Sequence, residues 1–491
     1  MDPILYWNDV ALEANRVSHS NGKMEQTGPT LSSRALAIVH LAMYDAYAGV
    51  IAKPGKLPHY LQNLGMPKPG ASAAAAVAAA AHSTLSALFP SQKSFFDLKH
   101  RQAGLSGGGL QKGHAFGLEV AAAMLKDRED DPNAGDKGYV PSLDRGAHRP
   151  DPDNPGQGFH GPFYGTARCF AVTQRHGLEP PPQPVQGDNE YRKALDEVRA
   201  KGIAPELMGT LPSGADPRTA DEYLIGIYWG YDGANGLGTP PRLYNQIIRE
   251  VAIARKIKPD ENARLFAFVN AAMADAGILA WEQKYLHDFW RPVIGIREDD
   301  PSMGPAAEEG KDKIRSTCDP GWLPLGAPST NANEGAAQSK HAYPCQTVRT
   351  ETVKNFTPPF PAYPSGHATF GAAAFQVARL FFKVPADAHQ DDLFKGLTFV
   401  SDEFNGANKD NKGTVRPRHV RSFPRGLWQM IEENGYSRVV LGVHWIFDAF
   451  LRKADGSPDL DKNVGGVPLG LAIAKDIFQA GGGEAPKRSN V

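Results

Sequence analysis

Cysteine is scarce in this sequence: three occur in 491 residues, at Cys169, Cys318 and Cys345, and no two of them form a CxxC pair. The sequence therefore gives no reason to expect a zinc site built from cysteines. Cys318 and Cys345 flank a Pro-, Gly- and Asn-rich loop, where a crosslink restrains an unfolded chain most. These two residues either form a disulfide or are unrelated thiols.

An excess of positive charge is also missing. The 53 Lys and Arg residues are balanced by 54 Asp and Glu residues, which gives a formal net charge of −1. Broad binding of nucleic acids or anionic membranes usually needs a basic surplus. We therefore expect neither partner, and any cationic site must be local.

Long hydrophobic runs are absent as well. A segment that crosses a bilayer needs about 20 apolar residues. The most alanine-rich run, residues 71–81, is followed at once by His82, Ser83 and Thr84. The first residues lack the basic and then apolar pattern of a signal peptide. The sequence predicts no membrane span. The protein either stays inside the cell or is already processed, so the sequence does not assign its subcellular location.

Helical periodicity dominates what is present, and strand signals are sparse. At 53.0 kDa the chain exceeds the usual size of one core. We predict an all-α fold of two helical bundles with long irregular connections. The predicted units are an N-terminal bundle with a Pro/Gly-rich connection (1–190), a C-terminal bundle (191–480) and a flexible tail (481–491).

The expected helices follow the apolar spacing. They cover residues 34–50, 71–88, 113–126, 219–231, 241–256, 261–290 with an interruption near Gly277, 365–382, 393–405, 423–434, 436–451 and 467–480. In the helix 113–126, Leu118 is one of the residues expected to be buried. His40 and Asp45 lie inside the first helix, where structural roles are expected. Residues 127–189 and 297–361 are predicted to be irregular.

Three short segments in the last 210 residues carry the chemistry. They are Lys284-x6-Arg291-Pro292, Pro364-Ser365-Gly366-His367 and Ser437-Arg438-x5-His444-x3-Asp448. Together they supply three cations, a hydroxyl group, a glycine at a helix start and two histidines. A tetrahedral oxyanion, phosphate or its mimic vanadate, needs such a set of groups.

The spacing within each segment suggests its geometry. Lys284 and Arg291 are seven residues apart, so both should project from one helical face, although a surface pair of cations is the simpler explanation of this segment alone. Gly366 at a helix start would let an anion approach free backbone N–H groups. His444 and Asp448 should share a face, so Asp448 either orients the His444 ring or bonds to a neighbouring helix.

In order and spacing, the three segments resemble the signature of the vanadium-dependent haloperoxidases and the type 2 phosphatidic acid phosphatase superfamily. Residues 228–233, 238–246, 289–292, 325–328 and 442–445 further resemble the fungal vanadium chloroperoxidases, as do 15–17 and 465–470. This resemblance implies a vanadate cofactor. His444 would bind the vanadium, and the oxygens of vanadate would be held by Lys284, Arg291, Ser365, Gly366 and Arg438.

The resemblance also implies a reaction. Hydrogen peroxide would oxidise bromide or chloride to hypohalous acid, which halogenates a small organic acceptor. His367 would be the acid–base group that deprotonates peroxide, Lys284 would contact the peroxide, and Asp232 would brace Arg438. Trp281 and Phe360 match the aromatic wall of the halide site. Algal bromoperoxidases carry histidine where Phe360 stands, so phenylalanine favours chloride as a substrate too.

Other functions fit part of the same pattern. A soluble acid phosphatase would use His444 as the nucleophile and His367 as the general acid. Phosphate would then fill the pocket, as it could in a haloperoxidase lacking vanadate. A non-catalytic oxyanion-binding protein would have no use for His367. A halogenase selective for one bound substrate and an enzyme that releases hypohalite share this sequence pattern, and a homo-oligomer is compatible with it.

Overall fold

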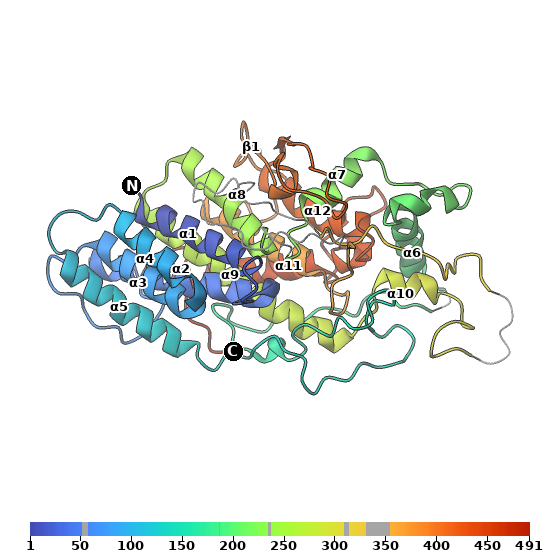
Figure 1. The fold of residues 1–491 in the computed structure, drawn as a ribbon, viewed down its shortest axis with the longest axis horizontal. Helices are drawn as coiled ribbons and strands as arrows, with labels where there is room; N and C mark the ends of the chain where they lie inside the picture. Colours follow the sequence, from blue (N-terminus) through green and yellow to red (C-terminus); the bar gives the residue numbers. More distant parts are fainter. Residues whose placement is uncertain (52–56, 186, 234–236, 309–313, 330–353) are drawn as a thin grey trace.

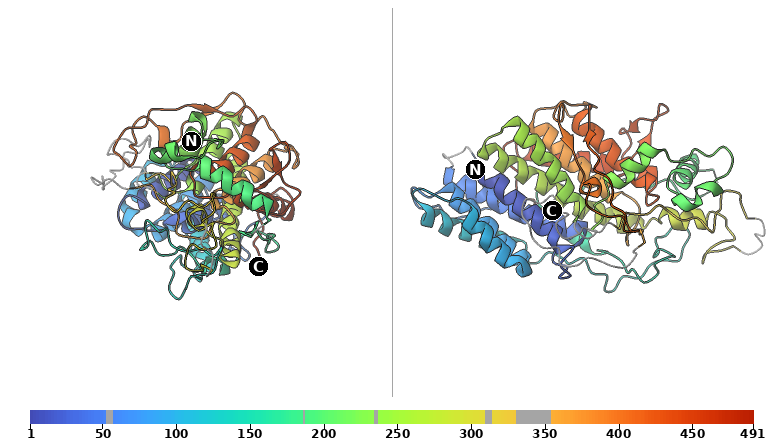
Figure 2. Two further views of the ribbon diagram at one scale, coloured as in Figure 1. Left: turned by 90° about the vertical axis from the view of Figure 1, so that its right-hand side faces the viewer. Right: turned by 45° about the horizontal axis from the view of Figure 1, so that its top comes forward.

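A computed structural model describes residues 1–51, 57–185, 187–233, 237–308, 314–329 and 354–491. The fold is all-α, as predicted, with the helices of the first 127 residues at one end of an elongated molecule and the helices over residues 189–201 and 292–297 towards the other (Figures 1 and 2). The only strands in the described ranges form two short antiparallel pairs. They are β1 (Thr398–Phe399) with β2 (Arg421–Ser422), and β3 (Leu451–Arg452) with β4 (Pro458–Asp459).

The N-terminal bundle begins at a capped helix, because the Asp2 side chain accepts hydrogen bonds from the backbone N–H groups of Ile4 and Leu5. Five α-helices build this end: α1 (Pro3–Ser18), α2 (Gly28–Ile51), α3 (Ala73–Leu88), α4 (Lys93–Gln102) and α5 (Leu110–Asp127). The alanine-rich face of α3 packs closely on α5. Leu118 of α5 is 42% exposed, so its predicted burial is wrong.

The connection after α5 is irregular, as predicted, and runs along the outside of the helices (Figure 1). Within its described residues, the 3-10 turn η2 (Tyr164–Thr166) is the one helical element before α6 begins. The next elements are α6 (Asn189–Lys201), η3 (Pro205–Thr210), α7 (Ala220–Tyr228) and α8 (Pro240–Arg255).

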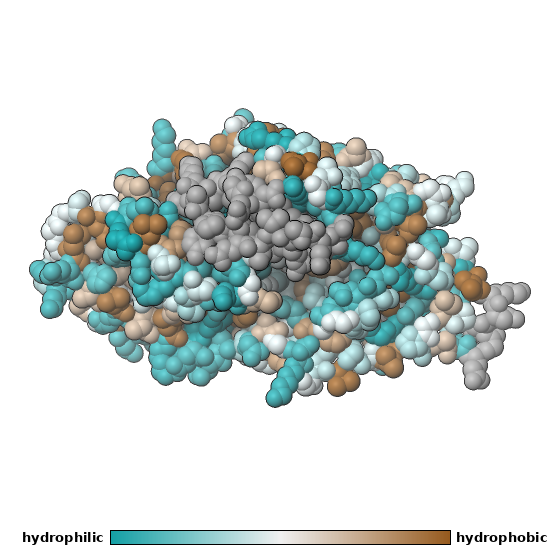
Figure 3. All heavy atoms as spheres, in the orientation of Figure 1, coloured by the Kyte–Doolittle hydropathy of each residue, from teal (hydrophilic) through white to brown (hydrophobic). Residues whose placement is uncertain are grey.

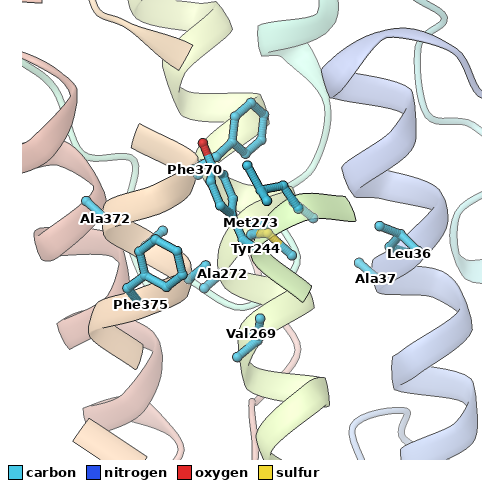
Figure 4. Packing of buried hydrophobic residues seen from close by; sticks show 14 of the residues in the cluster. Leu36, Ala37, Tyr244, Val269, Ala272, Met273, Phe370, Ala372 and Phe375 are labelled. Atoms are coloured by element: carbon cyan, nitrogen blue, oxygen red, sulfur yellow. The ribbon is translucent and has the colours of Figure 1, made fainter. Parts of the chain in front are cut away.

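Helix α9 (Pro259–His287) lies between α2 and α11 (Gly366–Phe381) and packs against both (Figure 4). The interruption predicted near Gly277 is wrong, because α9 is continuous there. A Cβ atom at Gly277 would lie 3.0 Å from Ser33 Oγ and 3.2 Å from the Phe370 ring. This glycine therefore serves close packing of three helices.

After α9 come α10 (Pro292–Arg297), α11, η4 (Asp402–Phe404), α12 (Gly426–Val440), η5 (Ile446–Asp448) and α13 (Gly466–Ala480). Two predicted helices are wrong. Residues 393–405 form turns, β1 and η4. The helix predicted over 436–451 does not exist as such, because α12 ends at Val440. Gly442, with φ +72°, lies just beyond that end, where a left-handed residue commonly stops a helix.

The C-terminal residues 481–491 differ from the predicted flexible tail, since they are hydrogen-bonded to the body. The backbone N–H of Cys169 donates to the Val491 carbonyl (2.7 Å), and that of Ser489 donates to the Phe170 carbonyl (2.8 Å). Cys318 is buried. Cys345 lies outside the described residues, so the choice between a Cys318–Cys345 disulfide and two unrelated thiols stays open. The division into units at residue 190 stays a prediction.

Two helices, α2 and α9, are long and apolar enough to cross a membrane by length and composition alone. In these helices, 78% and 94% of the apolar window is buried inside the protein, as expected for core helices. On the face drawn in Figure 3, single hydrophobic residues are scattered among hydrophilic ones.

Candidate active site

A cavity of about 150 Å³ lies at the start of α11. Seven of the predicted site residues, which come from distant parts of the chain, line it together: Asp232, Trp281, Phe360, Gly366, His367, Arg438 and His444. The other three adjoin it. Arg291 contacts His444, Lys284 contacts the carbonyl group that precedes Ser365, and the Ser365 backbone contacts Asp448. The structure therefore brings all ten into one place.

His444 is held from both sides. Its Nδ1 lies 2.8 Å from Asp448 Oδ2, which also accepts the backbone N–H of Trp445, and its Nε2 lies 2.9 Å from Arg291 Nη1. Burial, Arg291 and Lys284 lower the pKa of His444 well below its ordinary value. The ring is thus neutral, with Nδ1–H donating to the carboxylate and a lone pair on Nε2. A neutral Nε2 can bind a metal or act as a nucleophile.

Around this cavity, two buried arginine nitrogens have no hydrogen-bond partner among the described residues. They are Arg291 Nη2 and Arg438 Nε. Asp232 accepts two hydrogen bonds from the other end of Arg438, at 2.8 and 3.1 Å, and so fixes its guanidinium group. Leaving a buried N–H group unpaired is costly, so both arginines are suited to a bound anion.

Lys284 is fully buried in the last turn of α9. Its Nζ donates to the carbonyl oxygens of Pro361 (2.8 Å), Ala362 (3.1 Å) and Pro364. Burial and the neighbouring Arg291 lower its pKa well below the ordinary value. In this arrangement Lys284 fixes the loop that leads into α11. A direct contact of Lys284 with an anion would replace one of these hydrogen bonds.

The start of α11 has features that favour an anion. Ser365 is the N-cap residue, whose hydroxyl accepts the Ala368 N–H, and its own backbone N–H donates to the Asp448 carbonyl (2.8 Å). Gly366 follows, and a Cβ atom there would lie only 3.3 Å from the Trp281 ring. Free N–H groups and the helix dipole favour negative charge at this position.

His367 is a neutral base in this pocket. Its Nε2 lies 2.7 Å from the Gly230 carbonyl oxygen, so Nε2 carries the hydrogen and Nδ1 keeps its lone pair. Burial and Arg438 lower its pKa to about 4, although Asp232, whose Oδ1 is 3.9 Å from Nε2, opposes this change. Nδ1 can therefore accept a proton at neutral pH.

The aromatic wall is compact. The ring centroids of Trp281 and Phe360 are 4.8 Å apart, and the charged groups of Lys284 and Arg291 lie 5.0 and 4.9 Å from the Phe360 ring. His160 also lines the cavity and was not predicted from the sequence. It lies in the irregular connection, where no periodicity marks a buried position.

Two predictions from spacing are wrong in their geometry. Lys284 and Arg291 do not share a helical face, because α9 ends at His287 and Arg291 is the N-cap residue of α10. Likewise His444 and Asp448 meet across a turn and η5, not along a helix. Asp448 nevertheless contacts the His444 ring, which was one of the two alternatives left open.

The all-α fold is shared with vanadium-dependent haloperoxidases. Two solved structures are similar in fold. A bacterial vanadium-dependent iodoperoxidase has a TM-score of 0.64 and 18% identity over 97% of this chain and 96% of that one. A holo-type bacterial vanadium-dependent chloroperoxidase has a TM-score of 0.57 and 16% identity over 95% and 96%.

Sequence comparison is more specific. The model of the vanadium chloroperoxidase N-terminal domain matches residues 1–159, and that of the VCPO second helical-bundle domain matches residues 264–453. The vanadium chloroperoxidase of Curvularia inaequalis is 34% identical over 97% of this chain and 90% of that protein. The chain belongs to the vanadium chloroperoxidase family.

Proposed function

We propose that this protein is a vanadate-dependent haloperoxidase that uses hydrogen peroxide to oxidise bromide and chloride to hypohalous acid, which then halogenates a small organic acceptor. The observation that carries the proposal is the neutral His444 ring beside two buried arginine N–H groups that have no hydrogen-bond partner in the described part of the chain. A ring nitrogen and unpaired cationic donors are the complement of a metal oxyanion.

The residues present fit vanadate. His444 would hold the metal through Nε2 after Arg291 releases that atom, while Asp448 keeps the ring in the required tautomer. Arg291, Arg438, Lys284, Ser365 and the Gly366 backbone would hold its oxygens and neutralise their charge. Bound vanadium(V) would supply a Lewis acid that polarises peroxide without changing its own oxidation state.

His367 is placed to move the proton of the reaction. Its Nδ1 would accept a proton as hydrogen peroxide binds, while the Gly230 carbonyl fixes the tautomer through Nε2. Lys284 and the two arginines would withdraw negative charge from the peroxide. This makes the peroxide oxygen a better electrophile towards halide.

The halide range follows from the aromatic wall. Trp281 and Phe360 enclose one end of the cavity, and two cations lie behind the Phe360 ring. The positive potential of these cations favours an anion, and phenylalanine adds no titratable group. We expect chloride as well as bromide to be oxidised.

Reconstitution with orthovanadate tests this function directly. Halogenation of monochlorodimedone is measured with hydrogen peroxide and either bromide or chloride, with and without added vanadate. Vanadate-dependent halogenation is the expected result, and activity with chloride would support the interpretation of Phe360. Absence of halogenation with both halides would contradict the proposal.

A soluble acid phosphatase is the second candidate, because a neutral histidine braced by a carboxylate can equally attack phosphorus. Phosphate would then occupy the same pocket, with His444 as nucleophile and His367 as general acid. The matching experiment is p-nitrophenyl phosphate hydrolysis by the vanadate-free protein. Brisk hydrolysis inhibited by vanadate, together with no halogenation, would favour this function.

A further inference from the structure

The proposed halide pocket has few groups that can bind an anion at its aromatic end, which we define by His160, Trp281, Phe356 and Phe360 together with Pro29, Pro358 and Pro359. Proline offers no N–H group. A halide that leaves water for such a surface needs a hydrogen-bond donor to replace its hydration.

Most donors of the aromatic end are already used. The Trp281 indole N–H donates to the His160 carbonyl (3.0 Å), and the His160 backbone N–H donates to the Pro359 carbonyl (2.8 Å). The backbone N–H groups of Phe356 and Phe360 donate to the carbonyl oxygens of Ala327 (3.2 Å) and Pro358 (2.9 Å). Among the described residues of this end, the imidazole ring of His160 is the remaining donor.

The His160 ring occupies a defined place. Its centroid lies 5.9 Å from that of Trp281 and 6.2 Å from that of Phe360, and its Nε2 is 3.0 Å from the Thr30 hydroxyl. A Cβ atom at Gly28 would come within 2.5 Å of His160 Cε1, so the glycine leaves room for the ring. Nδ1 has no hydrogen-bond partner among the described residues.

The contact with the Thr30 hydroxyl allows the ring hydrogen to be on Nδ1. A hydroxyl group can donate or accept, so it can give its hydrogen to Nε2 and leave the ring hydrogen on Nδ1. Burial lowers the pKa of His160 to about 4, so the ring is neutral at neutral pH and tautomer, not charge, sets its role. An N–H group then becomes available without leaving Nε2 unpaired.

From this placement we infer that His160 is the anion-binding residue of the halide pocket, with its Nδ1–H donating to the halide beside Trp281 and Phe360. The inference rests on the proposed haloperoxidase function and adds a residue that determines halide affinity. Its backbone carbonyl has a second task, because it fixes the Trp281 indole and the Tyr285 hydroxyl (2.8 Å).

Two variants with side chains similar in shape to histidine test the contributions of the two ring nitrogens separately. His160→Asn keeps a side-chain N–H close to the position of Nδ1, whereas His160→Gln keeps a partner for Thr30 near Nε2 and offers no donor at Nδ1. We expect His160→Gln to raise the KM for bromide roughly tenfold or more, as for loss of a hydrogen bond to a charged group. His160→Asn should stay within about threefold of the unsubstituted protein, and both should keep the KM for peroxide and the vanadate affinity within about twofold. Thermal melting shows whether each variant is folded.

Crystals soaked in bromide provide a readout that does not depend on turnover. An anomalous peak within hydrogen-bond distance of the His160 ring is expected in the unsubstituted protein and should be lost in His160→Gln. If the unsubstituted protein halogenates but both variants keep its KM for bromide, the inference is overturned. If it does not halogenate at all, the proposed function fails, and the bromide peak alone decides the role of His160.

Discussion

At the scale of single residues, His444 depends on Asp448, a neighbour that does not itself line the cavity. Asp448 Oδ2 accepts hydrogen bonds from His444 Nδ1 and from the Trp445 backbone, so one carboxylate sets both the tautomer and the orientation of the ring. Burial raises the pKa of Asp448 to about 7, an effect that Lys284 and Arg291 oppose. A side chain in this position controls the affinity of the ring for a metal.

Replacing that carboxylate should weaken vanadate binding while leaving every proposed ligand in place. For Asp448→Asn we expect a loss of about 10- to 100-fold in orthovanadate affinity, as is typical when such a partner is removed. Equilibrium dialysis against orthovanadate measures it. Asp461→Asn, a change of an exposed carboxylate on the surface, is the matched control and should bind normally. Equal affinity in both variants would show that Asp448 does not position His444.

The residues that meet at this cavity could be selected from the sequence because the cations, histidines and glycine have the spacing of the family signature. Their geometry was not predictable, since it depends on where helices end. Asp288, with φ +46°, ends α9 three residues before Arg291. Arg291 therefore does not continue the helical face that carries Lys284. His160 was missed for a different reason. Its position is fixed by Pro359, Trp281 and Thr30, which are all distant in sequence.

Asp45 is a buried carboxyl group far from the site, and it makes stability depend on pH. The backbone N–H groups of Tyr60 (2.7 Å) and Leu61 (3.0 Å) donate to it, yet burial raises its pKa from 3.8 to about 7. Between these values the folded state binds more protons than the unfolded state. The free energy of unfolding contributed by Asp45 therefore falls as pH rises through this window, by up to about 1.4 kcal/mol per pH unit.

Urea unfolding of the unsubstituted protein and of Asp45→Asn at about pH 4.5, 6 and 8 tests this sign. The free energy of unfolding of the unsubstituted protein, relative to the variant, should decrease from the lowest pH to the highest. The pKa of His59, whose Nδ1 is 3.9 Å from the carboxylate, is lowered by burial, so this residue changes stability with pH in the opposite direction. The variant keeps His59, so most of this contribution drops out of the comparison. Parallel pH profiles would contradict the prediction.

At the scale of elements, α3 and α5 approach so closely that one methyl group should disturb them. A Cβ atom at Gly117 would lie 2.1 Å from the Ala76 carbonyl oxygen and 2.8 Å from Ala79 Cβ. The sequence predicted both helices from their periodicity, but not this contact. The reason is that alanine and glycine carry little hydrophobic pattern to indicate which face is buried.

Gly117→Ala should therefore destabilise the protein even though alanine favours helix over glycine by about 1 kcal/mol. Overpacking costs about 1–3 kcal/mol, and a clash with a backbone oxygen belongs to the upper part of this range, so we expect a net loss of about 1–2 kcal/mol in urea unfolding. The control is Ala115→Gly on the exposed side of the same helix, which should lose only the intrinsic preference of about 1 kcal/mol. Stabilisation by Gly117→Ala would refute close packing at this position.

At the scale of the whole molecule, the irregular connection is held at one point by both the core and the C-terminal residues. Asp275 of α9 accepts the backbone N–H groups of Phe170, Ala171 (2.7 Å) and Val172 (2.9 Å). On the other side, the Ser489 hydroxyl donates to the Val172 carbonyl (2.7 Å). The all-α class could be predicted because it follows from local periodicity. This attachment could not, because single hydrogen bonds between distant segments leave no pattern in the sequence.

Deleting residues 485–491 should loosen this attachment without touching any residue of the cavity. The deletion removes the backbone hydrogen bonds to Cys169 and Phe170, the buried Ala485, and the ion pair of Arg488 with Asp127. We expect faster tryptic cleavage within residues 127–189, because local opening exposes Arg168 and Arg175. Limited proteolysis with mass spectrometry identifies the cut sites. Arg488→Ala removes only the partly exposed ion pair, which is worth about 1 kcal/mol or less, and should leave the cleavage rate nearly unchanged. If both variants were cut faster than the unsubstituted protein and at equal rates, the ion pair would hold the connection in place. The backbone contacts of residues 485–491 would then not be needed. If neither variant were cut faster, these residues would not hold the connection.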